Sequence, residues 1–175
     1  MKYLLLLVLL SLSHLLRAQT QSIKKWHADS LLTRDDFQGK PDPASSFHAA
    51  SCCMISYNCK IIKTPQGNEP DFKVEALFNR SLAWMKGNMS DQTLRHENFH
   101  FAIEELNARI LLKAFKAIRY SPSFKTEVEQ AYALIRKKTD DMHHTYDEES
   151  YRSLNVAGQK RWEEYITQEL ANLPR

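Results

Sequence analysis

The hydrophobic pattern of this 175-residue chain changes its period near residue 90. Before that point apolar and polar residues alternate, which is typical of half-buried strands. After it, apolar residues recur every three to four positions, which is typical of helices that bury one face. Strands followed by helices favour an α+β domain. We therefore expect an N-terminal antiparallel sheet packed on two long helices, with a third, C-terminal helix.

Two of the expected strands form a hairpin. The segment Ser51–Ile62 alternates, and Phe72–Phe78 alternates again after the turn-forming residues Thr64–Asn68. A further short strand is predicted over Leu31–Phe37, ahead of Gly39.

The helical half begins at Ser90, a residue type that caps helix N-termini, and the first helix is expected to run to about Tyr120. A second helix is predicted after Ser121, and a third over Gly158–Asn172 with Trp162 and Ile166 facing inward. The apolar face expected for the second helix consists of Phe124, Val128, Ala131, Tyr132, Ile135, Met142 and Tyr146.

The first 18 residues have the composition of a secretory signal peptide. Lys2 precedes an apolar run, Leu4–Leu16, that is shorter than the roughly 18 to 20 residues needed to span a bilayer. Ala18 supplies a small residue at the expected cleavage point. We expect residues 1–18 to be removed and residues 19–175 to form one secreted or periplasmic domain, without a stable membrane anchor.

The charge and cysteine content narrow the function classes. The net charge of +3 falls to +1 without Lys2 and Arg17, and the remaining cations are not clustered as in a dedicated nucleic-acid binder.

The three cysteines are Cys52, Cys53 and Cys59. On a continuous strand Cys53 and Cys59 would lie about 20 Å apart, too far for a disulfide. We expect buried, structural thiols.

The residues that carry chemistry lie in the first predicted helix, at His96-Glu97-Asn98-Phe99-His100. A four-residue spacing places both imidazoles on one helix face, one turn apart, so that two nitrogens can bind one tetrahedral zinc ion. Glu97 lies off that face and can act as a general base that deprotonates water. The plainer alternative is a pair of surface histidines. Apolar neighbours on both sides of the motif favour a buried site instead.

A third zinc ligand is expected from the second helix. At about 100° per residue, Glu149 falls within the apolar face of that helix, whereas Asp147 points away from it. A buried acid needs a cationic partner, and a metal held by the two histidines would supply one. The alternatives are that the helix ends before Glu149, or that Glu149 pairs with Arg152. We predict Glu149 as the ligand, with Asp147 and His143 as the next candidates.

Four segments of the chain carry a resemblance to a known family: Leu32–Gly39, Ser81–Lys86, His96–Phe101 and Tyr146–Ser150. Their order and spacing resemble those of a bacterial family described as predicted secreted zinc-dependent proteases. The resemblance implies a small zincin-like fold, with a sheet packed on the helix that bears the metal site, and a peptidase role. The family's late motif is Tyr-Asp-x-Glu-Thr-x-His-Gly, and this chain has Arg152 and Ser153 in the last two places.

These observations predict an exported zinc-dependent hydrolase, a peptidase acting on peptide or protein substrates. His96, His100 and Glu149 would bind zinc, and Glu97 would be the catalytic base. The alternative is an exported, non-catalytic binding protein that retains a degenerate or structural metal site.

Overall fold

The computed structural model describes residues 22–175, and the predicted signal peptide lies outside the described residues. The described chain is an α+β structure with small antiparallel sheets and three long helices, as the sequence predicted. The main sheet has the strand order β1-β4-β3, where β1 is Ile23–Lys25, β3 is Cys53–Thr64 and β4 is Gly67–Asn79. None of the helices in residues 22–175 has the length and apolar character needed to cross a membrane.

Strands β3 and β4 form the predicted hairpin. Their pairing runs from Cys53 opposite Phe78 to Thr64 opposite Gly67, so two residues make the turn. Gly67 adopts a φ of 123°, which glycine tolerates because it has no side chain. The alternation gives the sheet one buried face, made by Ile55, Val74, Ala76 and Phe78.

The strand predicted over Leu31–Phe37 is wrong. The chain instead forms a 3₁₀ turn at η1, Arg34–Asp36. Asp36 Oδ2 accepts a hydrogen bond from the Thr33 backbone N–H at 2.8 Å, and this local bond stabilises a turn rather than an extended chain. Leu32 and Phe37 are nevertheless buried in the core.

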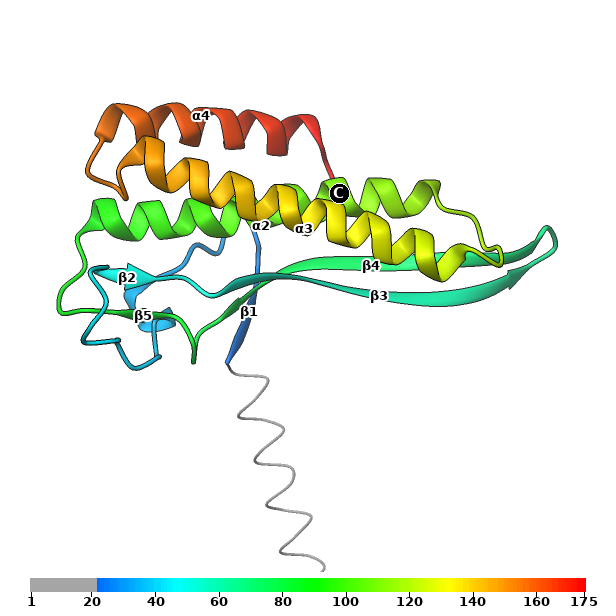
Figure 1. Cartoon of the computed structure of the whole chain (residues 1–175), viewed down its shortest axis with the longest axis horizontal. Coiled ribbons are helices and arrows are strands. Elements are labelled where there is room, and N and C mark those ends of the chain that lie inside the picture. Colours follow the sequence, from blue (N-terminus) through cyan, green and yellow to red (C-terminus); the bar gives the residue numbers. More distant parts are fainter. Residues whose placement is uncertain (1–21) are drawn as a thin grey trace, which may run out of the picture.

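The three helices are α2 (Asp91–Ala117), α3 (Phe124–Ser150) and α4 (Val156–Asn172). Ser90 caps α2 as predicted, because its hydroxyl accepts a hydrogen bond from the Thr93 N–H at 3.0 Å. Helix α2 lies on the main sheet, and helices α3 and α4 pack against α2 (Figure 1). A short two-stranded sheet, formed by β2 (Ala49–Ala50) and β5 (Trp84–Met85), lies near the N-terminal end of α2 (Figure 1).

Helix α2 is buried on two sides. One side packs on the sheet through Phe101, Ala108, Leu111 and Phe115. Another side packs on the other two helices and contributes to a second cluster that contains Ile103, Leu106, Tyr146 and Ile166. Burial on both sides fixes the position and rotation of the helix that carries the histidine motif.

The cysteines remain unpaired, as predicted, but the structure corrects their expected burial. Cys52, Cys53 and Cys59 are free thiols, and each is partly exposed. The hairpin extends beyond the helices (Figure 1). Strand β3 is therefore less covered toward its tip, where Ile61 and Ile62 are exposed.

Asp36 ties three segments of the fold together. It is 3% exposed, and its carboxylate contacts Lys24 Nζ at 2.9 Å and Arg80 Nε at 2.7 Å. Burial would raise the pKa of Asp36, but the hydrogen bonds from Thr33 and Lys24 and the nearby cations lower it below its ordinary value.

We predict that Asp36→Asn lowers the free energy of unfolding by about 2 kcal/mol at pH 7, because a buried carboxylate that pairs with two partly buried cations is lost. The pKa of Asp36 in the folded protein lies below its ordinary value. The stability that Asp36 contributes is therefore complete above the ordinary pKa and is lost as the pH falls through the lower, folded pKa. Urea denaturation at pH 7 and pH 3 measures the difference, and the exposed neighbour Asp35→Asn is the control. Equal stability of both variants at pH 7 would contradict the prediction.

Candidate metal centre

His96 and His100 lie one turn apart in the N-terminal part of α2 and face the C-terminal part of α3. Their Nε2 atoms are 3.1 Å apart. The ring of Tyr146 on α3 stacks on His96, with centroids 4.5 Å apart, and meets His100 edge-on at 5.0 Å. The fully buried Tyr146 ring therefore restricts both imidazoles to one orientation.

Asp147, the next residue on α3, completes a triangle of ligand-type atoms. Its Oδ1 lies 3.0 Å from His96 Nε2 and 2.9 Å from His100 Nε2. Within residues 22–175, these three residues form the one group whose ligand atoms lie close enough together to hold a metal ion.

The tautomer of His96 follows from its other ring nitrogen. His96 Nδ1 lies 3.4 Å from Ser150 Oγ, and that hydroxyl donates its own proton to the Tyr146 carbonyl oxygen at 2.6 Å. Ser150 Oγ can therefore act toward His96 as an acceptor, which places the ring proton on Nδ1. The lone pair of His96 Nε2 is then directed toward Asp147.

His100 is oriented by a chain of polar groups that leads away from the triangle. Its Nδ1 lies 2.9 Å from His143 Nδ1, and His143 Nε2 faces Glu104 Oε2 at 3.9 Å. Glu104 is fully buried and also binds Arg136 at 3.0 Å. A protonated His143 Nε2 facing the carboxylate leaves His143 Nδ1 to accept from His100 Nδ1–H. His100 Nε2 then also presents a lone pair.

Three electron-rich atoms within 3.1 Å of one another repel unless protons or one metal cation lie between them. Ligand atoms around a tetrahedral zinc ion, at about 2.0–2.1 Å from the metal, lie roughly 3.3 Å apart. The observed triangle is close to that size. Two imidazoles and a carboxylate are also a donor set that zinc accepts, so the residues fit the metal.

The pKa shifts favour the ligating forms of these side chains. Burial disfavours a charged imidazole and lowers the pKa of His100. Burial would raise the pKa of Asp147, but the adjacent imidazoles of His100 and His96 outweigh it and lower that pKa well below its usual range. A neutral imidazole and an ionised carboxylate are the protonation states that bind metals.

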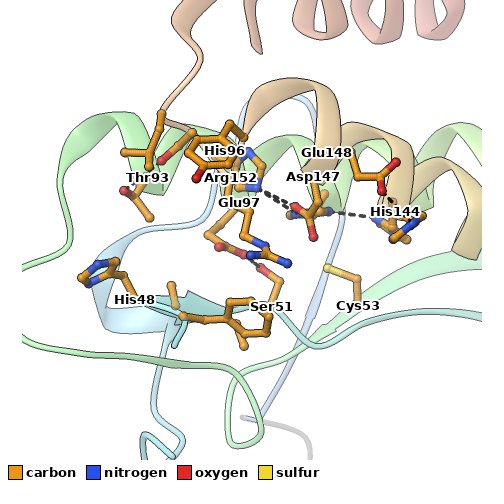
Figure 2. A pocket seen from close by; sticks show the side chains of 18 of the residues that line it. His48, Ser51, Cys53, Thr93, His96, Glu97, His144, Asp147, Glu148 and Arg152 are labelled. Carbon is orange, nitrogen blue, oxygen red and sulfur yellow. Dashed lines mark hydrogen bonds and ion pairs between the residues drawn. The ribbon is translucent and has the colours of Figure 1, made fainter. Parts of the chain in front are cut away.

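Glu97 lies beside the triangle and is not part of it. Its carboxylate is 6% exposed, and Ser51 Oγ donates to Oε2 at 2.5 Å. Figure 2 shows Glu97 directed toward the cavity wall that carries Ser51. Glu97 is thus available for a role other than metal binding.

The structure places Glu149 away from the two histidines, which corrects the expectation for the third ligand. Trp162 Nε1 on α4 donates to Glu149 Oε2 at 2.8 Å. The apolar face of α3 is wide because it contacts both α2 and α4. Glu149 lies toward α4, whereas Asp147 lies toward α2. His143, the other candidate, contacts His100 through Nδ1 and does not join the triangle.

An open cavity of about 860 Å³ adjoins the triangle. One wall is the segment 46–51 with the start of β3, and the other is formed by α2 and the end of α3 (Figure 2). His48 is exposed and also lines this cavity. The lining residues used below are Phe47, Ser51, Glu97, His100, Asp147 and Arg152.

Comparison of the chain with protein-family models, with curated proteins and with solved structures found no significant match. The assignment of a function therefore depends on the residues and their geometry.

We predict that Asp147→Ala reduces the affinity for zinc at least 100-fold, because it removes one of three ligand atoms. Glu149→Ala should leave the affinity unchanged, because that carboxylate binds Trp162. Zinc titration with a competing chelator measures both constants, and circular dichroism checks the fold. A loss of affinity in Glu149→Ala alone would restore Glu149 as the ligand.

The neighbouring histidines offer a second matched pair. His143→Ala should weaken zinc binding about 10- to 100-fold, because His100 loses the group that orients its ring. His144→Ala is the control, since His144 is exposed and contacts Glu148 on the same helix at 3.2 Å. The same chelator titration compares the two variants. Equal affinities would show that His143 does not orient the ligand.

Proposed function

We propose that this protein is a zinc-dependent hydrolase that cleaves peptide bonds outside the cytoplasm. The observation that carries the proposal is the convergence of His96, His100 and Asp147 on one point beside Glu97, at the wall of a large cavity. The His-Glu-x-x-His spacing and the resemblance to secreted zinc-dependent proteases support the same function.

The residues of the site divide into two roles. His96, His100 and Asp147 would hold zinc, which when bound acts as a Lewis acid and makes water acidic enough to lose a proton near neutral pH. Ser51 occupies Oε2 of Glu97 with a hydrogen bond and fixes the plane of the carboxylate. Oε1 of Glu97 can then take the proton from the attacking water and give it to the leaving amine.

The size of the cavity supports a peptide-like substrate. Ligand pockets commonly have volumes of about 300–1,000 Å³, and this cavity, at about 860 Å³, lies toward the upper end of that range. Its position between the 46–51 segment and α2 gives a substrate access to both Glu97 and the histidines.

The alternative, a non-catalytic binding protein with a structural metal, is less well supported. Structural zinc sites are closed, with four protein ligands. In the described part of the chain the group has three protein ligands and adjoins an open cavity. Three ligands and an accessible position are typical of catalytic zinc sites.

We predict that Glu97→Gln in the protein comprising residues 19–175 retains near-stoichiometric zinc and loses hydrolysis by about two to four orders of magnitude. The glutamine keeps the shape of the side chain but cannot accept the proton. Elemental analysis gives the metal content and identifies the metal, which distinguishes zinc from iron(II), another metal bound by two histidines and a carboxylate. Cleavage of a mixed peptide library gives the activity.

The control for this experiment is Glu164→Gln, which changes an exposed acid on α4 that pairs with Lys160. Activity of Glu97→Gln equal to the parent would exclude Glu97 as the base. A zinc-loaded parent protein that cleaves no peptide in the library would favour the binding-protein alternative.

A further inference from the structure

Three consecutive residues after α3 adopt left-handed backbone conformations. Their φ angles are 47° for Tyr151, 49° for Arg152 and 76° for Ser153. None is glycine, and each such residue costs about 1–2 kcal/mol relative to an ordinary conformation. A turn of this kind persists only where its surroundings hold it in place.

Contacts from both sides hold this turn. The Arg152 N–H donates to the carbonyl oxygen of Asp147 at 3.0 Å, so the turn is bonded to a candidate ligand residue. Ser153 contacts the first turn of α2 through Gln92 and Thr93. The turn therefore gives Arg152 a fixed starting point at the edge of the site.

The side chain of Arg152 extends across the cavity. Its guanidinium lies over the ring of Phe47, 4.4 Å from the ring centroid, on the opposite wall. Figure 2 shows Arg152 reaching from the end of α3 toward the wall that carries Ser51. Stacking uses the flat face of a guanidinium and leaves its N–H donors, which lie in the plane, available to a ligand.

Within residues 22–175, two arginines line this cavity. Arg152 is the one of them that has no acidic partner in this described part of the chain. Arg136, the other lining arginine, is paired with Glu104 and Asp140. Among the acids that line the cavity, Glu148 is the nearest to the turn in sequence, and it contacts His144. The donors of Arg152 are thus not neutralised by the cavity's own acids.

We propose that Arg152 binds a carboxylate of the substrate and gives this hydrolase a preference for carboxylate-bearing peptides. The inference rests on the proposed function of the same site. A planar guanidinium with free in-plane donors matches the two oxygens of a carboxylate, and such charge-assisted pairs are stronger than neutral hydrogen bonds. The carboxylate belongs to either the C-terminus of a peptide or an acidic side chain.

The test uses pairs of small probes that bind metal through a hydroxamate. Each pair comprises the monohydroxamate of malonic, succinic or glutaric acid, with its second carboxylate free, and the same compound with that group as an amide. Three chain lengths cover different separations of the two binding groups. Calorimetry measures the dissociation constants for the zinc-loaded protein, Arg152→Met and Arg152→Lys, with Lys138→Met as a control that removes an exposed cation elsewhere.

In the parent protein and in Lys138→Met, the acid probe of at least one length should bind about 10-fold or more tightly than its amide. In Arg152→Met this preference should fall to about onefold while the amide probe binds as before, which shows that the metal site and the fold are intact. Arg152→Lys should retain part of the preference. Equal binding of acid and amide by the parent, or an unchanged preference in Arg152→Met, would overturn the inference.

Failure of the proposed function has a different signature. If neither probe of any pair binds more tightly to the zinc-loaded protein than to the metal-free protein, the metal site itself is refuted and the inference falls with it. Metal-dependent binding without a preference for the acid refutes the role of Arg152 alone.

The two sources of carboxylate are distinguished by competition against the preferred acid probe. N-acetyl-Ala-Ala-Phe with a free C-terminus is compared with its C-terminal amide. N-acetyl-Ala-Asp-Phe-amide is compared with its asparagine counterpart. Stronger competition in the first pair assigns the C-terminus, and stronger competition in the second assigns an acidic side chain. Equal competition within both pairs would contradict carboxylate recognition in a peptide.

Discussion

The packing of α2 between the sheet and the other two helices is the constraint on which the rest of the structure depends. Apolar side chains such as Phe101 and Leu106 bury the helix on two sides, so its rotation is fixed by close packing. His96 and His100 inherit that rotation and face α3. The site is therefore positioned by the hydrophobic core, and its own polar contacts adjust the ring orientations within that frame.

The polar groups of the site are arranged to place lone pairs, rather than protons, at one point. Ser150 and His143 occupy the Nδ1 positions of the two histidines, and Asp147 contributes an ionised oxygen to the same point. Such a convergence is unfavourable in a protein interior unless a cation compensates it. The ring of Tyr146 packs on the imidazoles of His96 and His100 and holds them in place beside Asp147.

Local features of the sequence predicted most of the fold, and the histidine pair followed from spacing on a single helix. The hairpin and the cap at Ser90 depend on neighbouring residues, and the structure confirms them. Asp147 was harder to identify because its direction depends on how α3 rotates between two partner helices. The contact of Ser51 with Glu97 joins residues 46 positions apart, and no local pattern reveals it. Likewise, the bond from the Thr33 N–H to Asp36 forms a turn in place of the strand predicted over Leu31–Phe37.

The end of α3 explains why Asp147 and Arg152 act from one place. Gly158 at the start of α4 approaches the Glu149 carbonyl so closely that a Cβ there would clash with it, and Asn155 Nδ2 donates to the same oxygen at 2.8 Å. Helix α4 therefore fixes the last turn of α3, and the left-handed turn that follows reverses the chain toward the cavity. The strain of that turn is offset by the contacts of Ser153 with Gln92 and Thr93 at the start of α2. The two charged side chains, five residues apart, are thereby directed to one cavity from a single rigid segment.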